Sequence, residues 1–199
     1  MRNAEATRQK LIRAVGSILA RTGFTGIGIN ALAREAGVDK VLIYRYFDGL
    51  PGLIQAFGRE GGFWPSPEEL MGVKRETFVH LPVSERLQRL TLNFIRALRR
   101  RPLTLEIMAW ELVEKNDLTE ELERFREQSI LMVFSQGFPE RSRLPDLEAM
   151  AAIVGAAVSY LTLRARDTRW YTGVDLQDES GWRRLEQAFC ELIAGVVSG

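Results

Sequence analysis

The stretch at residues 28–47, GINALAREAGVDKVLIYRYF, constrains the fold more than any other part of this sequence. Its apolar residues recur at three- and four-residue steps, so it contains two short runs that each have one face for burial in a helix. Gly37 lies between the runs, where a helix ends most easily in a left-handed residue, and Val38 offers an apolar plug. Asp39 can cap the second helix by accepting backbone N–H bonds. The stretch therefore predicts two short helices joined by a tight turn.

The second of these helices carries more outward side-chain surface than its own stability needs. Ile43 and Phe47 are four residues apart and share the face that would be buried. The other faces carry basic, aromatic and aliphatic side chains, which are Lys40, Val41, Leu42, Tyr44, Arg45 and Tyr46. In a helix-turn-helix, the second helix offers such a face to the major groove of DNA. The pattern favours that interpretation, and the alternative is that Leu42 and Tyr46 belong to the core.

Residues 7–53 resemble the N-terminal domain of TetR-like transcriptional repressors. The residues that carry the resemblance are Ile12, Ala14, Leu19, Gly23, Phe24, Ile29, Leu32, Ala33, Ala36, Gly37, Val38, Tyr44, Arg45, Tyr46 and Phe47. The resemblance covers about a quarter of the chain. It implies an all-α fold of about nine helices, with an N-terminal three-helix helix-turn-helix head that binds DNA and a C-terminal helical body for ligand binding and dimerisation.

A break in composition marks the expected boundary between head and body. Residues 58–67 (GREGGFWPSP) hold three glycines and two prolines, which interrupt a helix. We therefore expect a DNA-binding domain at 1–57, a hinge or a plain linker at 58–67, and an effector-binding and dimerisation domain at 68–199.

The resemblance also assigns roles to single residues of the head. The positions that match base contacts are Asn30, Lys40, Val41, Leu42 and Tyr44, and those that match phosphate contacts are Arg45 and Tyr46. Lysine can donate to guanine O6 and N7, and asparagine can pair with the edge of adenine. The sequence departs from the family pattern at Gly28, where Ser or Thr is usual, at Val41, where Gly is usual, and at Leu50, where Lys is usual. Because two of these changes remove phosphate contacts, we expect weaker binding that depends less on salt.

Dimerisation is expected because one recognition helix reads only a few base pairs. In the family, two heads enter successive major grooves of a palindromic operator, about 34–36 Å apart. The apolar stretches at 146–166 and 180–198 resemble the helix pair that forms a four-helix bundle across the two-fold axis. The expected interface residues are Met150, Val154, Ala157, Val158, Leu161, Leu185, Phe189, Leu192 and Val196. The alternative is that these residues are the core of a single chain.

Effector binding is the remaining expectation. The resemblance implies a small apolar effector in a pocket of the middle helices, lined by Phe94, Met108, Trp110, Glu111, Phe125 and Phe134, although aromatic residues at helical spacing also make an ordinary core. Such an effector must favour a conformation that binds DNA poorly. The expected function is a ligand-responsive transcriptional regulator, a repressor that leaves its operator when the effector binds. The alternative is a dimeric all-α small-molecule-binding protein with little or no DNA binding.

The composition argues against other classes of protein. Cys190 is the only cysteine and His80 the only histidine, and no nucleophile pair, glycine-rich phosphate loop or metal-ligand cluster accompanies them. We therefore expect no enzyme activity, no cofactor and no metal. No run approaches 18 uncharged apolar residues, and the N-terminus MRNAEATRQK lacks the apolar segment of a secretory signal, so we expect a cytoplasmic protein without a membrane partner. Residues 1–50 hold eight Lys and Arg against four Asp and Glu, which suits a head that approaches phosphate.

Overall fold

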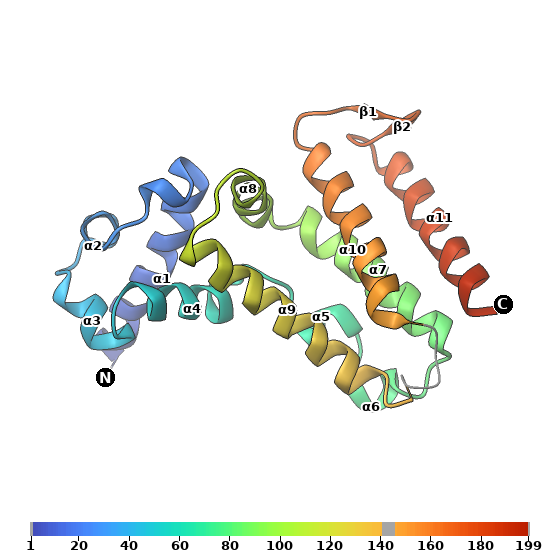
Figure 1. Ribbon diagram of the computed structural model, residues 1–199, viewed down its shortest axis with the longest axis horizontal. Coiled ribbons are helices and arrows are strands. Elements are labelled where there is room, and N and C mark those ends of the chain that lie inside the picture. Colours follow the sequence, from blue (N-terminus) through green and yellow to red (C-terminus); the bar gives the residue numbers. More distant parts are fainter. Residues whose placement is uncertain (1, 141–145, 199) are drawn as a thin grey trace. The chain divides into compact units, whose positions relative to one another are not determined.

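A computed structural model describes residues 2–140 and 146–198 (Figure 1). Over these residues the chain forms eleven α-helices, a short 3₁₀ turn and a two-stranded hairpin. The expected all-α fold is confirmed. The chain separates into two compact units: unit 1 takes in residues 2–64 and 101–128, and unit 2 takes in residues 65–100, 129–140 and 146–198. The functional division at 58–67 stays a prediction, because compactness does not test it.

Unit 1 is built around the first helix of the chain. Its elements are α1 (Arg2–Thr22), η1 (Phe24–Gly26), α2 (Ile29–Ala36), α3 (Val41–Phe47), α4 (Leu50–Glu60), α8 (Pro102–Glu111) and the first part of α9 (Asp117–Gly137). Apolar residues on one face of α1 are fully buried, and they are Leu11, Ile12, Val15, Ile18 and Leu19. They share a core with Ile43 and Phe47 of α3, Leu53 of α4 and Ile107 of α8. Each such side chain stabilises the unit by about 1.5–3 kcal/mol through burial.

Helix α8 packs against two glycines, Gly16 in α1 and Gly23 directly after it. A Cβ atom at Gly16 would lie 2.8 Å from Cδ2 of Leu103, and a Cβ atom at Gly23 would lie 2.7 Å from Cδ2 of Trp110. A larger residue at Gly16 would require the Leu103 side chain to move, and one at Gly23 would meet the Trp110 ring at a left-handed φ of 64°. This close fit makes residues 102–111 part of the unit that carries the helix-turn-helix.

Unit 2 is organised around the helix that spans residues 83–99. Its elements are α5 (Pro67–Met71), α6 (Arg75–Phe78), α7 (Val83–Arg99), the rest of α9, α10 (Leu147–Arg164), β1 (Trp170–Tyr171), β2 (Val174–Asp175) and α11 (Glu179–Ser198). Helices α5, α10 and α11 all pack on α7, and Figure 1 shows the hairpin between the ends of α10 and α11. Arg86 of α7 is buried, donates to the carbonyl of Gly137, pairs with Glu140 and lies over the ring of Phe138. Arg86 therefore links α7 to the C-terminal end of α9.

Two local features of unit 2 leave little signal in the sequence. Gly72 adopts a left-handed φ of 69° and separates α5 from α6, so residues 67–79 form two short helices. This split contributes to the count of eleven helices rather than about nine. Between α10 and α11, Trp170 pairs with Asp175 in an antiparallel hairpin. Strands of two residues are too short to leave an alternating pattern in a sequence.

Helix α10 leaves most of its surface outside the core of unit 2. It is the one described helix long and apolar enough to cross a membrane, judged by length and composition alone, and only 22% of its span is buried. By itself this is weak support for a membrane span, because other apolar helices pass the same test. The exposed apolar surface does require a cover.

Candidate nucleic-acid interface

The turn between α2 and α3 has the geometry that the sequence predicts. Gly37 adopts the left-handed conformation with φ 64° and ψ 39°. Its N–H donates to the carbonyl of Arg34 at 3.2 Å, and the N–H of Val38 donates to the carbonyl of Ala33 at 3.0 Å. These two bonds form a Schellman motif, in which the last carbonyls of a helix find partners. The side chain of Val38 packs against the core of unit 1, so the angle between the helices is fixed by both bonds and burial.

The start of α3 is capped by a carboxylate. Oδ1 of Asp39 accepts a hydrogen bond from the backbone N–H of Val41 at 2.9 Å. A negative side chain at a helix N-terminus also interacts favourably with the helix dipole. Asp39 therefore holds the first turn of α3 in place, with Lys40 and Val41 at its outer end.

The end of α3 is joined to α4 by a turn that requires glycine. Asp48 adopts a left-handed φ of 58°, and Gly49 follows with a φ of 105°. A Cβ atom at Gly52 would lie only 1.8 Å from the carbonyl oxygen of Phe47. Helix α4 thus begins in direct backbone contact with the last turn of α3, and a larger residue at position 52 would move one helix from the other.

Two ion pairs connect α1 to other helices of unit 1, one to α4 and one to α2. Arg8 pairs with Glu60 of α4, with Nη2 2.6 Å from Oε1, and its guanidinium lies 5.2 Å from the ring centre of Phe47. Arg21 pairs with Glu35 of α2 at 2.9 Å. Hydrogen bonds from the arginines lower the pKa of Glu60 and of Glu35. Surface pairs of this kind contribute at most about 1 kcal/mol each, so they orient the helices more than they stabilise them.

The side chains of α3 divide into a buried and an outward face. Ile43 is fully buried and Phe47 is 7% exposed. Val41 is 61% exposed and Tyr44 is 56% exposed. Of the other expected DNA contacts, Asn30, Lys40 and Arg45 are exposed, whereas Leu42 and Tyr46 are half-buried and pack against the core. Five of the seven residues are thus free to meet a ligand.

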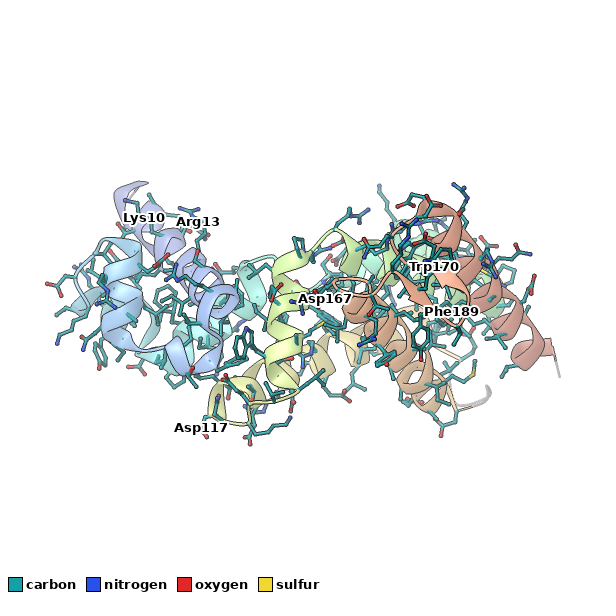
Figure 2. The ribbon with its side chains drawn as sticks, turned by 90° about the horizontal axis from the view of Figure 1, so that it is seen from above. Lys10, Arg13, Asp117, Asp167, Trp170 and Phe189 are labelled. Atoms are coloured by element: carbon teal, nitrogen blue, oxygen red, sulfur yellow. The ribbon has the colours of Figure 1, made fainter. Side chains whose placement is uncertain are left out.

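The outward face is basic. Among the residues that the structure describes, neither Lys40 nor Arg45 forms an ion pair with a carboxylate. The same holds, within residues 2–140 and 146–198, for Lys10 and Arg13 of α1, whose side chains Figure 2 shows near each other on the outside of that helix. Cations without internal partners are available to phosphate groups.

The residues expected to line an effector pocket fall in both units. Met108, Trp110, Glu111 and Phe125 lie in unit 1, and Phe94 and Phe134 lie in unit 2. In unit 1, Glu111 is 5% exposed and pairs with Arg126 at 2.7 Å. Burial raises the pKa of Glu111, and the hydrogen bond from Arg126 opposes that rise. The pocket stays a prediction.

Sequence reasoning did not anticipate Arg126. Its guanidinium lies 5.9 Å from the ring centre of Phe63 and 5.6 Å from that of Trp64, in addition to its pair with Glu111. The aromatic pair in an otherwise glycine-rich stretch was the available signal, because such rings need a packing partner.

The expected dimer residues divide by exposure. Val158, Leu161 and Phe189 are buried inside unit 2, whereas Leu192 is 68% and Val196 is 52% exposed. Met150, Val154, Ala157 and Leu185 are half-buried. The structure adds two residues that were not expected, since Ile153 is 72% and Tyr160 is 49% exposed. Their seven-residue spacing, with Ala156 between them, places them on one stripe of α10. The apolar residues on the other sides of that helix hide the stripe in the sequence.

Replacing Gly28 with Ser should strengthen the helix-turn-helix. Gly28 is the N-cap of α2, has an extended φ of −172° and offers no side chain to the helix, and a Cβ atom there would meet nothing within 4 Å. A serine hydroxyl can accept from the first N–H groups of α2, and we expect it to raise the free energy of unfolding by a few tenths of a kcal/mol. The measurement is thermal unfolding by circular dichroism. Gly28→Ala is the matched control and should lower stability, because alanine is a poorer N-cap residue than glycine and brings no hydroxyl. Equal effects of Ser and Ala would contradict the prediction.

Residues 11–57 match the model of a family described as bacterial regulatory proteins, tetR family. No curated protein sequence matches the chain. Solved structures do match over nearly the whole length. The fatty acid degradation regulator FadR from Bacillus halodurans has a TM-score of 0.65 at 17% identity, with 95% of each chain covered.

Two further solved structures show the same likeness. NalD from Pseudomonas aeruginosa, the secondary repressor of the MexAB-OprM multidrug efflux pump, has a TM-score of 0.63 at 19% identity, with 94% of this chain and 96% of that chain covered. A TetR family transcription regulator from Marinobacter aquaeolei has a TM-score of 0.60 at 17% identity, with 94% and 98% covered. All three matched proteins are regulators by name.

Proposed function

We propose that this chain, a TetR-family protein by the match of residues 11–57 and by its fold, is a ligand-responsive transcriptional repressor that binds a palindromic operator as a homodimer. The observation that carries the proposal is the outward face of α3. Lys40, Val41, Tyr44 and Arg45 are exposed there while Ile43 and Phe47 anchor the helix in the core. A short, rigid helix with an unpaired basic face is what major-groove binding requires.

The exposed residues have distinct roles in this proposal. Lys40 donates to guanine O6 or N7, and Asn30 pairs with an adenine edge, so these residues supply base recognition. Arg45 contacts phosphate and sets the register of the helix on the duplex. Tyr46 and Leu42 are half-buried and support the helix from the core side.

DNA binding can be tested with the full chain and a labelled duplex from the region upstream of its own gene. We expect saturable binding by fluorescence anisotropy, with two chains per duplex and an affinity that falls as salt rises, because phosphate contacts release counterions. A shuffled duplex of the same length and composition is the control. Equal affinity for both duplexes would contradict operator recognition. Absence of binding to either would favour the alternative of a dimeric small-molecule-binding protein.

The proposed dimer forms through α10 and α11. Apolar side chains on the exposed sides of these helices have no cover within unit 2, and they are Ile153, Tyr160, Leu192 and Val196. A second copy related by a two-fold axis would present the same stripes and bury them in a four-helix bundle. Such an interface would also account for the low burial of α10 in the single chain.

A charge in this stripe should break the dimer. Ile153→Glu would bury an unpaired carboxylate in the proposed interface, which costs several kcal/mol, so we expect sedimentation to shift from the dimer mass to the monomer mass. Leu112→Glu is the matched control, because Leu112 is 77% exposed on unit 1 and lies outside the stripe. A dimer mass for both variants would count against this interface.

The effector is proposed to be small and apolar. The six predicted pocket residues are mostly aromatic, with Glu111 as the one charged group among them. Release from DNA requires that the effector bind the conformation with misplaced heads more tightly than the operator-bound one.

A further inference from the structure

The hairpin between α10 and α11 presents an exposed tryptophan on a well-defined backbone. Trp170 begins β1 and is 62% exposed. The strands are joined through Thr172 and Gly173, whose φ values of 46° and 78° are both positive, as a type I′ turn requires. Arg169 pairs with Asp175 across the hairpin at 3.0 Å, and its guanidinium lies 5.6 Å from the ring centre of Trp170. The indole therefore projects from a tight hairpin and not from an open loop.

The hairpin is attached to both neighbouring helices. The ring of Tyr171 meets the ring of Tyr160 of α10 edge-on, with 5.7 Å between the ring centres. After β2, the buried Leu176 accepts at its carbonyl from the indole N–H of Trp182 of α11 at 2.8 Å. Tyr160 belongs to the exposed stripe of α10, so Trp170 lies one residue from a side chain that contacts this stripe. Large aromatic side chains held in this way are common anchors of protein interfaces.

A second exposed apolar area lies at the far end of α11. Leu192 is 68% and Val196 is 52% exposed, and residues four apart share one face of a helix. At a rise of about 1.5 Å per residue, these positions lie about 20–25 Å along α11 from its first residue, Glu179. Figure 1 shows the hairpin at the other end of the helix. Trp170 therefore cannot cover Leu192 and Val196 of its own chain.

The charges near these two areas differ in sign. Residues 164–184, which include the hairpin, hold five arginines against four carboxylates, and two of those carboxylates, Asp175 and Glu179, pair with arginines of the same chain. Residues 146–153 of α10 and 190–196 of α11 hold Asp146, Glu148 and Glu191 and no lysine or arginine. If two copies paired in parallel, their acidic ends would come together. Antiparallel pairing places arginines beside carboxylates instead.

We propose that a second copy of this chain covers Trp170, and that the two copies pair antiparallel so that each Trp170 lies on Leu192 and Val196 of the other. Two-fold symmetry makes the contact twice. A tryptophan buries about 150–250 Å², so the two add about 300–500 Å² to an interface whose standard size is about 1,600 Å². This inference rests on the proposed homodimer. It adds the hairpin to the interface and the direction in which the copies pair.

Removal of the indole tests the contact. In the full chain, we expect Trp170→Ala to raise the dissociation constant of the dimer about 10³-fold, since truncation of an interface tryptophan corresponds to about thirtyfold at each of two sites. The measurement is sedimentation over a dilution series. Leu112→Ala is the matched control, because Leu112 is 77% exposed on unit 1, and its dissociation constant should equal that of the original chain. The circular dichroism spectra of both variants should also be unchanged.

Cross-linking tests the direction of pairing with the indole in place. In a Cys190→Ser background, Thr172→Cys puts a thiol at the exposed turn of the hairpin and Glu191→Cys puts one beside Leu192. We expect a short bismaleimide to join the double variant into a covalent dimer on a denaturing gel. Either single variant is the matched control and should stay monomeric there, because antiparallel pairing separates its two thiols.

The outcomes separate the inference from the proposed function. An original chain that dimerises while Trp170→Ala keeps its dissociation constant, or while the double variant stays unlinked, would overturn the inference and leave the homodimer standing. A covalent dimer from Thr172→Cys alone, as abundant as that from the double variant, would show that hairpin meets hairpin and would also overturn it. An original chain that is monomeric throughout the dilution series would overturn the homodimer, and the inference with it.

Discussion

The double variant Lys40→Ala, Tyr44→Ala is expected to lose operator binding by about 10³-fold or more. A well-placed contact to a base is worth about 1–3 kcal/mol, and in a two-fold complex each contact is made twice. Both side chains are exposed and neither contributes to the core of unit 1. The substitutions should therefore remove recognition without unfolding the head. The measurement is a gel shift at fixed salt with the duplex from the region upstream of the protein's own gene.

The matched control for this loss is Lys74→Ala, an exposed lysine of unit 2. It removes the same charge from each chain, so it reports any general effect of net charge on DNA affinity. The circular dichroism spectrum and melting temperature of the double variant should equal those of the original chain. Retained affinity in the double variant, with an intact fold, would show that this side of α3 does not face the groove.

We expect Gly52→Ala to lower the free energy of unfolding of unit 1 by about 1–3 kcal/mol. The added methyl group enters a contact that has no room for it. Alanine ordinarily favours a helix over glycine by about 1 kcal/mol, so the expected sign is opposite to the usual one. The reason is the added Cβ atom, which would lie 1.8 Å from the carbonyl oxygen of Phe47. Because that oxygen belongs to the backbone, no side-chain rotation can relieve the contact. The start of α4 and the end of α3 must move apart.

Thermal unfolding followed by circular dichroism measures this effect, and DNA affinity should fall with it because α3 is displaced. Gly195→Ala in α11 is the matched control, since a Cβ atom there meets nothing within 4 Å. It should follow the ordinary rule and gain stability. A gain in stability for Gly52→Ala as well would contradict the close backbone contact between α3 and α4.

The parts of the fold that the sequence predicts are those specified by neighbouring residues. The turn at Gly37 and Val38 and the cap at Asp39 follow from local chemistry, and the structure has both. The outward face of α3 follows from the spacing of Ile43 and Phe47. Five of the seven expected DNA contacts are exposed for the same reason.

The rest depends on contacts between distant segments. Nothing in the spacing of residues 102–111 reveals that Leu103 and Trp110 lie against Gly16 and Gly23. In α10, apolar residues occur on more than one side, so the sequence alone does not separate Val158, which is buried in unit 2, from Ile153, which is 72% exposed. The packing of α10 on α7 decides which side joins the core, and that contact is made between distant segments. The predicted pocket residues are divided between the units for a similar reason, because α8 packs with the head.

The packing of α8 against α1 determines which residues of this protein a hybrid regulator would need. A graft of residues 1–64 onto a foreign body would leave Gly16 and Gly23 without the two side chains that occupy them, and would remove Ile107 and Leu122 from the same core. Transplanting its operator preference therefore means moving residues 101–128 as well, as a second piece of chain inserted into the recipient.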